Sequence, residues 1–189
     1  MSDIETSGWI YKVRDNEWKE LTAIKIGKIK KNKNGNDITD DITKRYHTYY
    51  ISLDILSINE YQNYHNIEKL IHNLLEQFRH NSSEIFIGLH IKLSEIIINS
   101  VGEILENENI DLYIKQKAGQ KRKKMDTSEY SHKKDDSSVK VPPHLWEKIF
   151  YKIINKIKHQ YNIEYKSEFT SDYNYIIYEL NKFFNINKL

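Results

Sequence analysis

Apolar residues in the first sixty positions of the chain form short runs in which aromatic and β-branched side chains dominate. Residues 8–14 and 21–29 are two such runs, and turn-forming residues separate them, so they predict a β-hairpin. Residues 49–58 have the composition and length of a third strand. These segments together predict a small three-stranded antiparallel sheet.

Two connecting segments interrupt the predicted strands. Residues 30–37 contain almost only loop-forming side chains, which indicates a surface loop. The pair Asp40 and Asp41 then predicts the cap of a short helix that carries Ile42, Arg45 and Tyr46. The helix precedes the third strand.

Helical spacing is clearest over residues 67–78. Its apolar side chains recur at intervals of three and four, as Ile67, Leu70, Ile71, Leu74, Leu75 and Phe78. Glu68 and His72 fall outside this stripe, so we expect the helix to bury one side and expose the other. Residues 83–88 predict a short strand or turn, and residues 90–107 predict a second long helix.

The remainder of the chain divides into a polar segment and two amphipathic ones. Residues 115–140 hold hardly any aliphatic side chain and cannot bury a core, which predicts flexibility. Apolar stripes then predict a helix that begins near the two prolines at 142 and 143, and a last helix over residues 172–184. We expect an α+β domain over residues 8–108, a basic linker over 109–141, and a C-terminal helical hairpin over 142–189.

Composition excludes several classes of function. The chain of 189 residues contains no cysteine, which rules out disulfides, cysteine-based zinc sites and thiol nucleophiles and favours an intracellular protein. The N-terminus has no signal-peptide pattern, and no apolar run is long enough to span a bilayer, so we expect neither secretion nor a membrane partner. The net charge is only +2.

Positive charge is concentrated in residues 115–124, which hold six cations and no acidic residue. The cations are Lys115, Lys117, Lys121, Arg122, Lys123 and Lys124. Such a run can contact DNA phosphates or serve as a nuclear import signal, and it can also be a solvated linker. Any DNA binding through it is expected to be nonspecific and sensitive to salt.

Five short motifs follow one another in the first half of the chain. They are Gly-Trp-Ile-Tyr at 8–11, Ile-Lys-Ile-Gly-Lys at 24–28, Lys-Arg-Tyr at 44–46, Ile-Glu-Lys-Leu-Ile-His at 67–72 and Ser-Glu-Ile-Phe at 83–86. In this order they resemble the GIY-YIG endonuclease superfamily, and in particular its branch from phages, large DNA viruses and fungi. The resemblance covers about residues 8–88 and implies phosphodiester cleavage by a viral or mobile-element enzyme.

The resemblance also implies roles for particular residues. Tyr11 would orient or deprotonate the attacking water, Arg45 would hold the scissile phosphate, and Glu68 would bind a single Mg²⁺ or Mn²⁺. A planar guanidinium suits phosphate, and a hard cation prefers oxygen ligands. His72 lies one helical turn after Glu68, where it could orient the carboxylate, contact the phosphate or bind a backbone carbonyl. Lys28, on the second strand, is expected to contact the nucleic acid.

The chain departs from the superfamily pattern at two positions. Trp9 stands where a glycine opens the first motif, and Lys25 stands where a tyrosine opens the second. A lysine can donate to phosphate or lower the pKa of a neighbouring tyrosine, so Lys25 is a further site residue, but it cannot reproduce the geometry of a phenol.

Three hypotheses on function therefore stay open. The first is a DNA endonuclease, and the second is a DNA-binding protein without catalytic activity on the same surface. The third is a viral interaction protein whose C-terminal helices bind a protein partner. If the protein is viral, we expect it in the host cytoplasm or nucleus.

Overall fold

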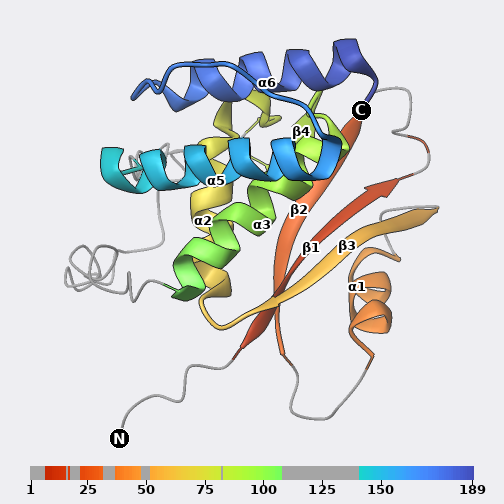
Figure 1. The fold of residues 1–189 in the computed structure, drawn as a ribbon. Helices are drawn as coiled ribbons and strands as arrows, with labels where there is room; N and C mark the ends of the chain where they lie inside the picture. The colour runs from red at the N-terminus through yellow and green to blue at the C-terminus, as the bar shows by residue number, and fades with distance from the viewer. Residues whose placement is uncertain are drawn as a thin grey trace, which may run out of the picture.

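The computed structural model describes residues 7–15, 17, 22–31, 37–47, 52–81, 83–107 and 141–189. Its centre is an antiparallel sheet in the order β3-β1-β2-β4 (Figure 1). The strands are β1 (Gly8–Asp15), β2 (Ala23–Lys30), β3 (Leu53–Tyr61) and β4 (Ile85–Ile87). The α+β class is confirmed.

The prediction of three strands is wrong, because β4 adds a fourth at the edge of the sheet. Only three residues of β4 pair with β2, from Ala23↔Ile87 to Lys25↔Ile85. A strand this short shows no period in the sequence, and its membership depends on Phe86, which is fully buried in the core. Strand β3 also begins later than predicted, at Leu53.

Alternate residues of β1 face opposite sides of the sheet, as the period of a strand requires. Ile10 belongs to the larger hydrophobic core on one side. Tyr11 and Val13 belong to a smaller core on the other side, with Ile42 and Tyr46. Each face of the sheet is therefore covered by different helices.

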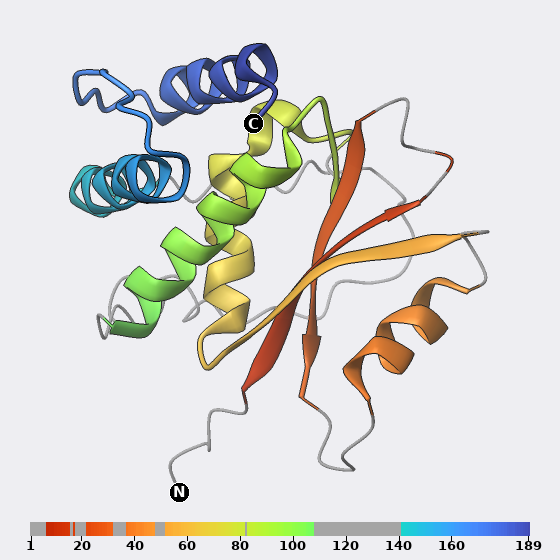
Figure 2. The same ribbon diagram turned by 45° about the vertical axis from the view of Figure 1, so that its right-hand side comes forward.

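Helix α1 (Ile38–Tyr46) covers the face that carries the smaller core (Figure 2). Its cap is Asp37, whose carboxylate accepts a hydrogen bond from the Thr39 backbone N–H at 2.9 Å. The prediction of Asp40 or Asp41 as the cap is wrong. Both lie in the first turn instead, where a negative charge interacts favourably with the helix dipole.

Four helices lie on the opposite face, in two layers (Figures 1 and 2). Helices α2 (Tyr64–Leu74) and α3 (Ile91–Asn107) are next to the sheet, and a short 3₁₀ turn, η2 (Glu76–Phe78), follows α2. Helices α5 (Pro143–Tyr161) and α6 (Tyr173–Asn187) form the outer layer. One hydrophobic core runs from β2 through α2 and α3 to both outer helices.

The two C-terminal helices run in the same direction, so the prediction of a helical hairpin is wrong. Trp146, near the start of α5, contacts Tyr173 at the start of α6, and Tyr161 at the end of α5 contacts Phe184 near the end of α6. Residues 162–172 run back along the helices between them (Figure 1). Eleven residues of extended chain reach about 36 Å, more than the roughly 28 Å of a 19-residue helix. An extended segment of this length can therefore lead from the end of α5 back to the start of α6.

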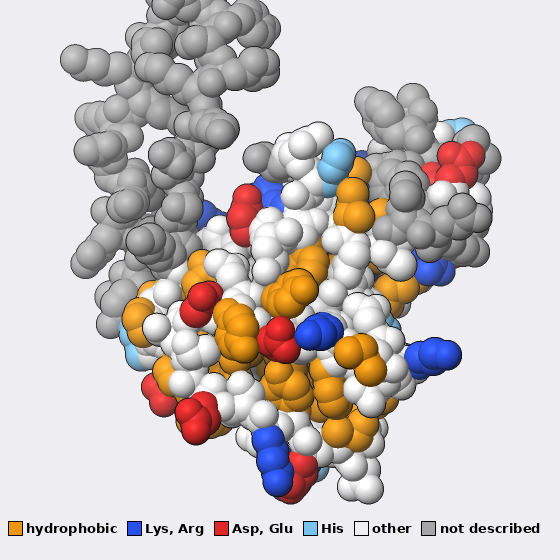
Figure 3. Space-filling model, turned by 90° about the horizontal axis from the view of Figure 1, so that it is seen from above, with side chains coloured by type: hydrophobic (Ala, Val, Ile, Leu, Met, Phe, Trp, Pro, Cys, Tyr) orange, Lys and Arg blue, Asp and Glu red, His pale blue; other side chains and the backbone are white. Residues whose placement is uncertain are grey.

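The outer surface of this layer mixes apolar and charged side chains (Figure 3). Its exposed apolar residues include Tyr151 on α5 and Tyr175, Tyr178 and Ile186 on α6. A protein partner of the C-terminal helices stays a prediction.

Two further predictions concern the linker and membrane-spanning segments. The linker over residues 109–141 lies outside the described residues except for Val141, which is buried in the core. Among the helices described, none has both the length and the apolar composition needed to cross a membrane.

Candidate functional site

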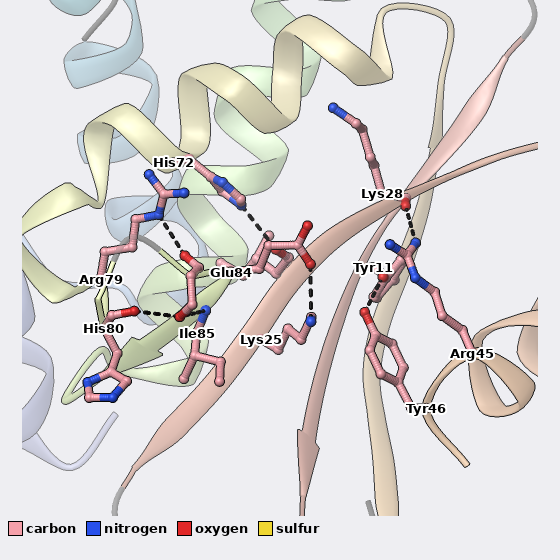
Figure 4. Close-up of polar contacts among 12 residues, drawn as sticks. Tyr11, Lys25, Lys28, Arg45, Tyr46, His72, Arg79, His80, Glu84 and Ile85 are labelled. Atoms are coloured by element: carbon pink, nitrogen blue, oxygen red, sulfur yellow. Dashed lines mark hydrogen bonds and ion pairs between the residues drawn. The ribbon is translucent and has the colours of Figure 1, made fainter. Parts of the chain in front are cut away.

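The candidate site lies along the edge of β2. Beyond Lys25 this strand loses its partner β4, and in the described part of the chain no other strand replaces it. Helix α1 reaches this edge from one face of the sheet and α2 from the other. Arg45 of α1 donates to the carbonyl of Lys28, and His72 of α2 bonds the carbonyl of Ile26 (Figure 4).

A pair of tyrosines occupies the α1 side of this edge. The Tyr11 ring is fully buried and lies against Gly27, its partner across β1 and β2. The Tyr11 hydroxyl is 2.5 Å from that of Tyr46, the last residue of α1. Burial raises the pKa of both phenols, although the hydrogen bond with Tyr46 and the nearby charge of Arg45 partly offset the rise for Tyr11. Both phenols are therefore protonated at neutral pH.

Gly27 is required by this arrangement. A Cβ atom at position 27 would lie 2.6 Å from the Tyr11 hydroxyl oxygen and 2.8 Å from the ring carbon that carries it. Such distances are shorter than any real contact of a Cβ atom. The glycine of the second motif thus makes room for the tyrosine of the first.

Lys25 stands beside the tyrosine pair. Its ammonium is 3.2 Å from the Glu84 carboxylate and 4.8 Å from the centre of the Tyr46 ring. The lysine therefore places a positive charge next to the Tyr46 phenol, whose pKa it lowers, and Glu84 compensates that charge. Glu84 also raises the pKa of Tyr11 through its negative charge.

Lys28 connects the two faces of the site. Its backbone carbonyl accepts a hydrogen bond from Arg45 Nη1 at 3.0 Å. Its ammonium group donates to Glu68 Oε2 on α2 at 2.6 Å. Arg45 and Glu68 belong to elements on opposite faces of the sheet, and both contact this single residue.

His72 makes the backbone contact that was one of its three predicted roles. Its Nε2 lies 3.0 Å from the carbonyl oxygen of Ile26, and its ring packs edge-on against Phe86. Burial lowers the pKa of His72, with Glu68 opposing the shift, so the imidazole is neutral and donates from Nε2. It supports the edge of β2.

The structure brings the predicted residues of the folded domain to the edge of β2. They lie there on the two opposite faces of the sheet. Tyr11, Lys25 and Arg45 lie on the α1 side, and Glu68 and His72 on the α2 side. The expectation that Glu68 and His72 lie on an exposed side of their helix is wrong, because α2 packs this side against the edge of β2. The six cations of residues 115–124 lie outside the described residues.

Sequence reasoning missed two residues of the site, Tyr46 and Glu84. Each stands inside a motif already noted, Tyr46 directly after Arg45 and Glu84 two residues before Phe86. The adjacency was visible in the sequence. Their partners, Tyr11 and Lys25, depend on how α1 and β4 pack on the sheet.

Glu68 is the residue that could hold a divalent cation. The described residues contain no group of three or more His, Asp or Glu side chains that could bind a metal together. Its carboxylate is paired with the Lys28 ammonium at 2.6 Å, so a metal ion would have to displace this lysine. Mg²⁺ is commonly held by one or two carboxylates together with substrate phosphates and waters, so Glu68 fits an ion that the substrate also helps to bind.

No protein-family model, curated protein or solved structure matches this chain. The geometry of the site and the motifs of the sequence are therefore what indicate a function.

Proposed function

We propose that the edge of β2 binds and cleaves a phosphodiester, and that the protein is a divalent-metal-dependent DNA endonuclease of viral or mobile-element type. The observation that carries this proposal is the contact of Arg45 and Glu68 with Lys28, next to the Tyr11–Tyr46 pair. A guanidinium, two ammonium groups, two carboxylates and two phenols lie along one strand edge. Cleavage of a phosphodiester uses groups of these types. The GIY-YIG resemblance supports the same function.

Hydrolysis joins a water oxygen to phosphorus and breaks the bond to one ester oxygen, which leaves with a proton. Arg45 is exposed and holds the nonbridging oxygens of the phosphate through its planar fork. Lys25 and Lys28 add positive charge where negative charge develops. Because its pKa is raised, Tyr11 does not serve as a phenolate base, and as a neutral phenol it orients water only when substrate binding opens its buried site.

Glu68 would hold the metal ion once the Lys28 ammonium has moved away from the Glu68 carboxylate. The ion supplies positive charge to the phosphate and lowers the pKa of a bound water. Lys28 is then free to donate to the substrate, since its ammonium is only half-buried. In this proposal Lys28 exchanges one anion, the carboxylate, for another, the phosphate.

A second function, DNA binding without cleavage, is favoured by a different observation. Tyr11 is fully buried, and Lys25 and Lys28 are already paired with Glu84 and Glu68. A site in this state lacks a phenol that water can reach. Arg45 remains accessible for a phosphate in either case.

A plasmid-nicking assay with Mg²⁺ or Mn²⁺, run beside a DNA-binding assay, separates the two functions. We expect the wild type to nick DNA, and Glu68→Gln and Tyr11→Phe to reduce the rate by about 100-fold or more, as loss of a catalytic group does. Glu147→Gln and Tyr178→Phe are matched controls on exposed positions of α5 and α6, and they should retain the wild-type rate. EDTA should abolish nicking.

The outcomes that contradict the proposal are distinct. Binding by all variants with no nicking by any supports the second function and excludes the first. Nicking that Glu68→Gln and Tyr11→Phe retain would show that these residues are not the site. Neither binding nor nicking would exclude both functions.

A further inference from the structure

A cavity of about 440 Å³ lies at the opposite end of β2 from Lys28. Its wall includes Arg14 at the end of β1, Ile24 near the start of β2, and the segment 88–92 that leads into α3. Asn185 of α6 closes part of it. None of the residues assigned to the candidate site lines this cavity, and its volume is in the range of small-molecule sites.

Three cationic or basic side chains line the cavity, namely Arg14, His90 and Lys92. Burial lowers the pKa of His90, and the charges of Lys92 and Lys12 lower it further. Among the described residues, Lys92 and Lys12 are the charged groups that shift this pKa, so cations and not carboxylates act on His90. The first turn of α3, a helix of 17 residues, begins at Ile91 in the same wall and adds the positive end of its dipole.

Two of these side chains have buried atoms without a partner. Within the described residues, neither Arg14 Nε nor His90 Nδ1 has a hydrogen-bond partner, although both atoms are shielded from solvent. Arg14 does contact Asp54 through Nη2, at 3.4 Å. A buried polar atom without a partner costs about 1–3 kcal/mol, so both side chains gain a hydrogen bond if they turn these N–H groups toward an anion bound in the cavity.

Another part of the wall is apolar. Ile24 and Leu89 are almost fully buried, and Ile91 is partly exposed next to them. A ligand that fills this cavity therefore needs an anionic group on one side and an apolar group on the other. A phosphate suits the anionic half better than a carboxylate, because it offers three terminal oxygens to donors from three side chains.

From this combination we propose that the cavity binds a phosphate monoester, with its phosphate at Arg14, His90 and Lys92 and its organic group against Ile24, Leu89 and Ile91. The ester is either a free small molecule or the phosphorylated end of a nucleic-acid strand, which share this chemistry. The proposal does not depend on nuclease activity at the other end of β2.

Isothermal titration calorimetry on the full-length protein tests the site with phenyl phosphate, inorganic phosphate and phenol. We expect phenyl phosphate to bind with one-to-one stoichiometry, inorganic phosphate to bind more weakly, and phenol not to bind. Lys92→Gln and Arg14→Gln should each lower the affinity for phenyl phosphate by about tenfold or more, since each removes a charged donor. Lys166→Gln, at an exposed position between α5 and α6, is the matched control and should bind like the wild type.

Lys92 is exposed on the first turn of α3, so Lys92→Gln keeps the test valid if Arg14→Gln fails to fold. Arg45→Ala distinguishes this cavity from the candidate site and should leave the affinity unchanged. Binding that Arg45→Ala abolishes and Lys92→Gln retains would overturn the proposal. So would no binding of any phosphate monoester, whether free or at a strand end.

The source of the ester is resolved by two further titrations, with deoxythymidine 5′-monophosphate and with a 5′-phosphorylated oligothymidylate. Binding of the mononucleotide supports a free ligand. Binding of the oligonucleotide alone, lost when its 5′-phosphate is removed, supports a strand end.

Discussion

Lys12 places an ammonium group in the core between β1 and α3. Its side chain has no exposed surface, and its Nζ donates to the Ile91 carbonyl at 3.0 Å and to Ser94 Oγ at 3.4 Å. Glu95 lies 3.7 Å away and is half-exposed. Burial lowers the pKa of Lys12 to about 8, and Glu95 offsets only part of the effect. The charged form is therefore destabilised in the folded protein.

This pKa predicts that the stability of the protein depends on pH through Lys12. The pKa is near 8 when folded and near 10.5 when unfolded, so between these values the unfolded chain binds more protons. The free energy of unfolding of the wild type should thus rise between pH 7 and pH 10, relative to Lys12→Met, by about 2 kcal/mol. Urea denaturation of both proteins at the two pH values measures this difference.

Other groups that titrate at high pH do not affect this comparison. Burial raises the pKa of Tyr61 to about 12, which lowers stability above pH 10, but wild type and variant share this residue. Parallel pH profiles for the two proteins would show that Lys12 keeps an ordinary pKa.

For the candidate site, the sequence points to single residues and not to their partners. The motifs identified Tyr11, Arg45 and Glu68, whose side-chain chemistry is visible in the sequence. The contact of Lys28 with both Arg45 and Glu68 depends on two helices that approach one strand from opposite faces. Lys12 was missed because a lysine in a strand normally points to solvent.

At the level of elements, the close packing of β1 on β2 is the feature that the site depends on. Tyr11 lies over Gly27, and its ring fills the space that a side chain at position 27 would take. The hydroxyl thereby reaches Tyr46 on α1. The pairing of β1 with β2 and the position of α1 on the sheet thus both depend on the absence of a side chain at Gly27.

Gly27→Ala should displace the Tyr11 ring and break its hydrogen bond with Tyr46. We expect a loss of about 1–3 kcal/mol in the free energy of unfolding, typical of overpacking. In a Tyr11→Ala background the same substitution should cost less than about 0.5 kcal/mol, because the clash is gone. Urea denaturation of the four proteins gives this double-mutant cycle, and equal costs in both backgrounds would contradict the role assigned to Tyr11.

Most elements were predictable from their periodicity, and the exceptions have physical causes. Strands β1 and β2 and helices α2, α3, α5 and α6 appear near their expected positions. Strand β4 lies within residues 83–88, which were predicted as a short strand or turn, but its place as a fourth strand of the sheet has no period in the sequence and accompanies the burial of Phe86 in the core. The polar side of α2 is buried because His72 and Glu68 satisfy groups on β2, which hydrophobic periodicity does not reveal.

At the scale of the whole molecule, the C-terminal helices complete the core of the sheet domain. Ile153 of α5 and Ile177 of α6 are fully buried in the same hydrophobic cluster as Ile24 and Ile26 of β2. Trp146 is also fully buried, and its indole N–H donates to the Thr170 carbonyl at 2.8 Å. Helices far from the sheet in sequence thus share its stability.

A continuous core predicts that α5 and the sheet unfold in one transition. Ile153→Ala should lower the free energy of unfolding by about 2–5 kcal/mol, the usual cost of such a cavity. It should also lower the free energy of opening measured by amide hydrogen exchange at Ile10 in β1 by the same amount. The reason is that, with one continuous core, β1 opens only when the whole molecule unfolds. Tyr178→Ala, at an exposed position of α6, is the control and should change stability by less than about 0.5 kcal/mol. If exchange at Ile10 stays unchanged while α5 loses protection, the helices unfold separately from the sheet.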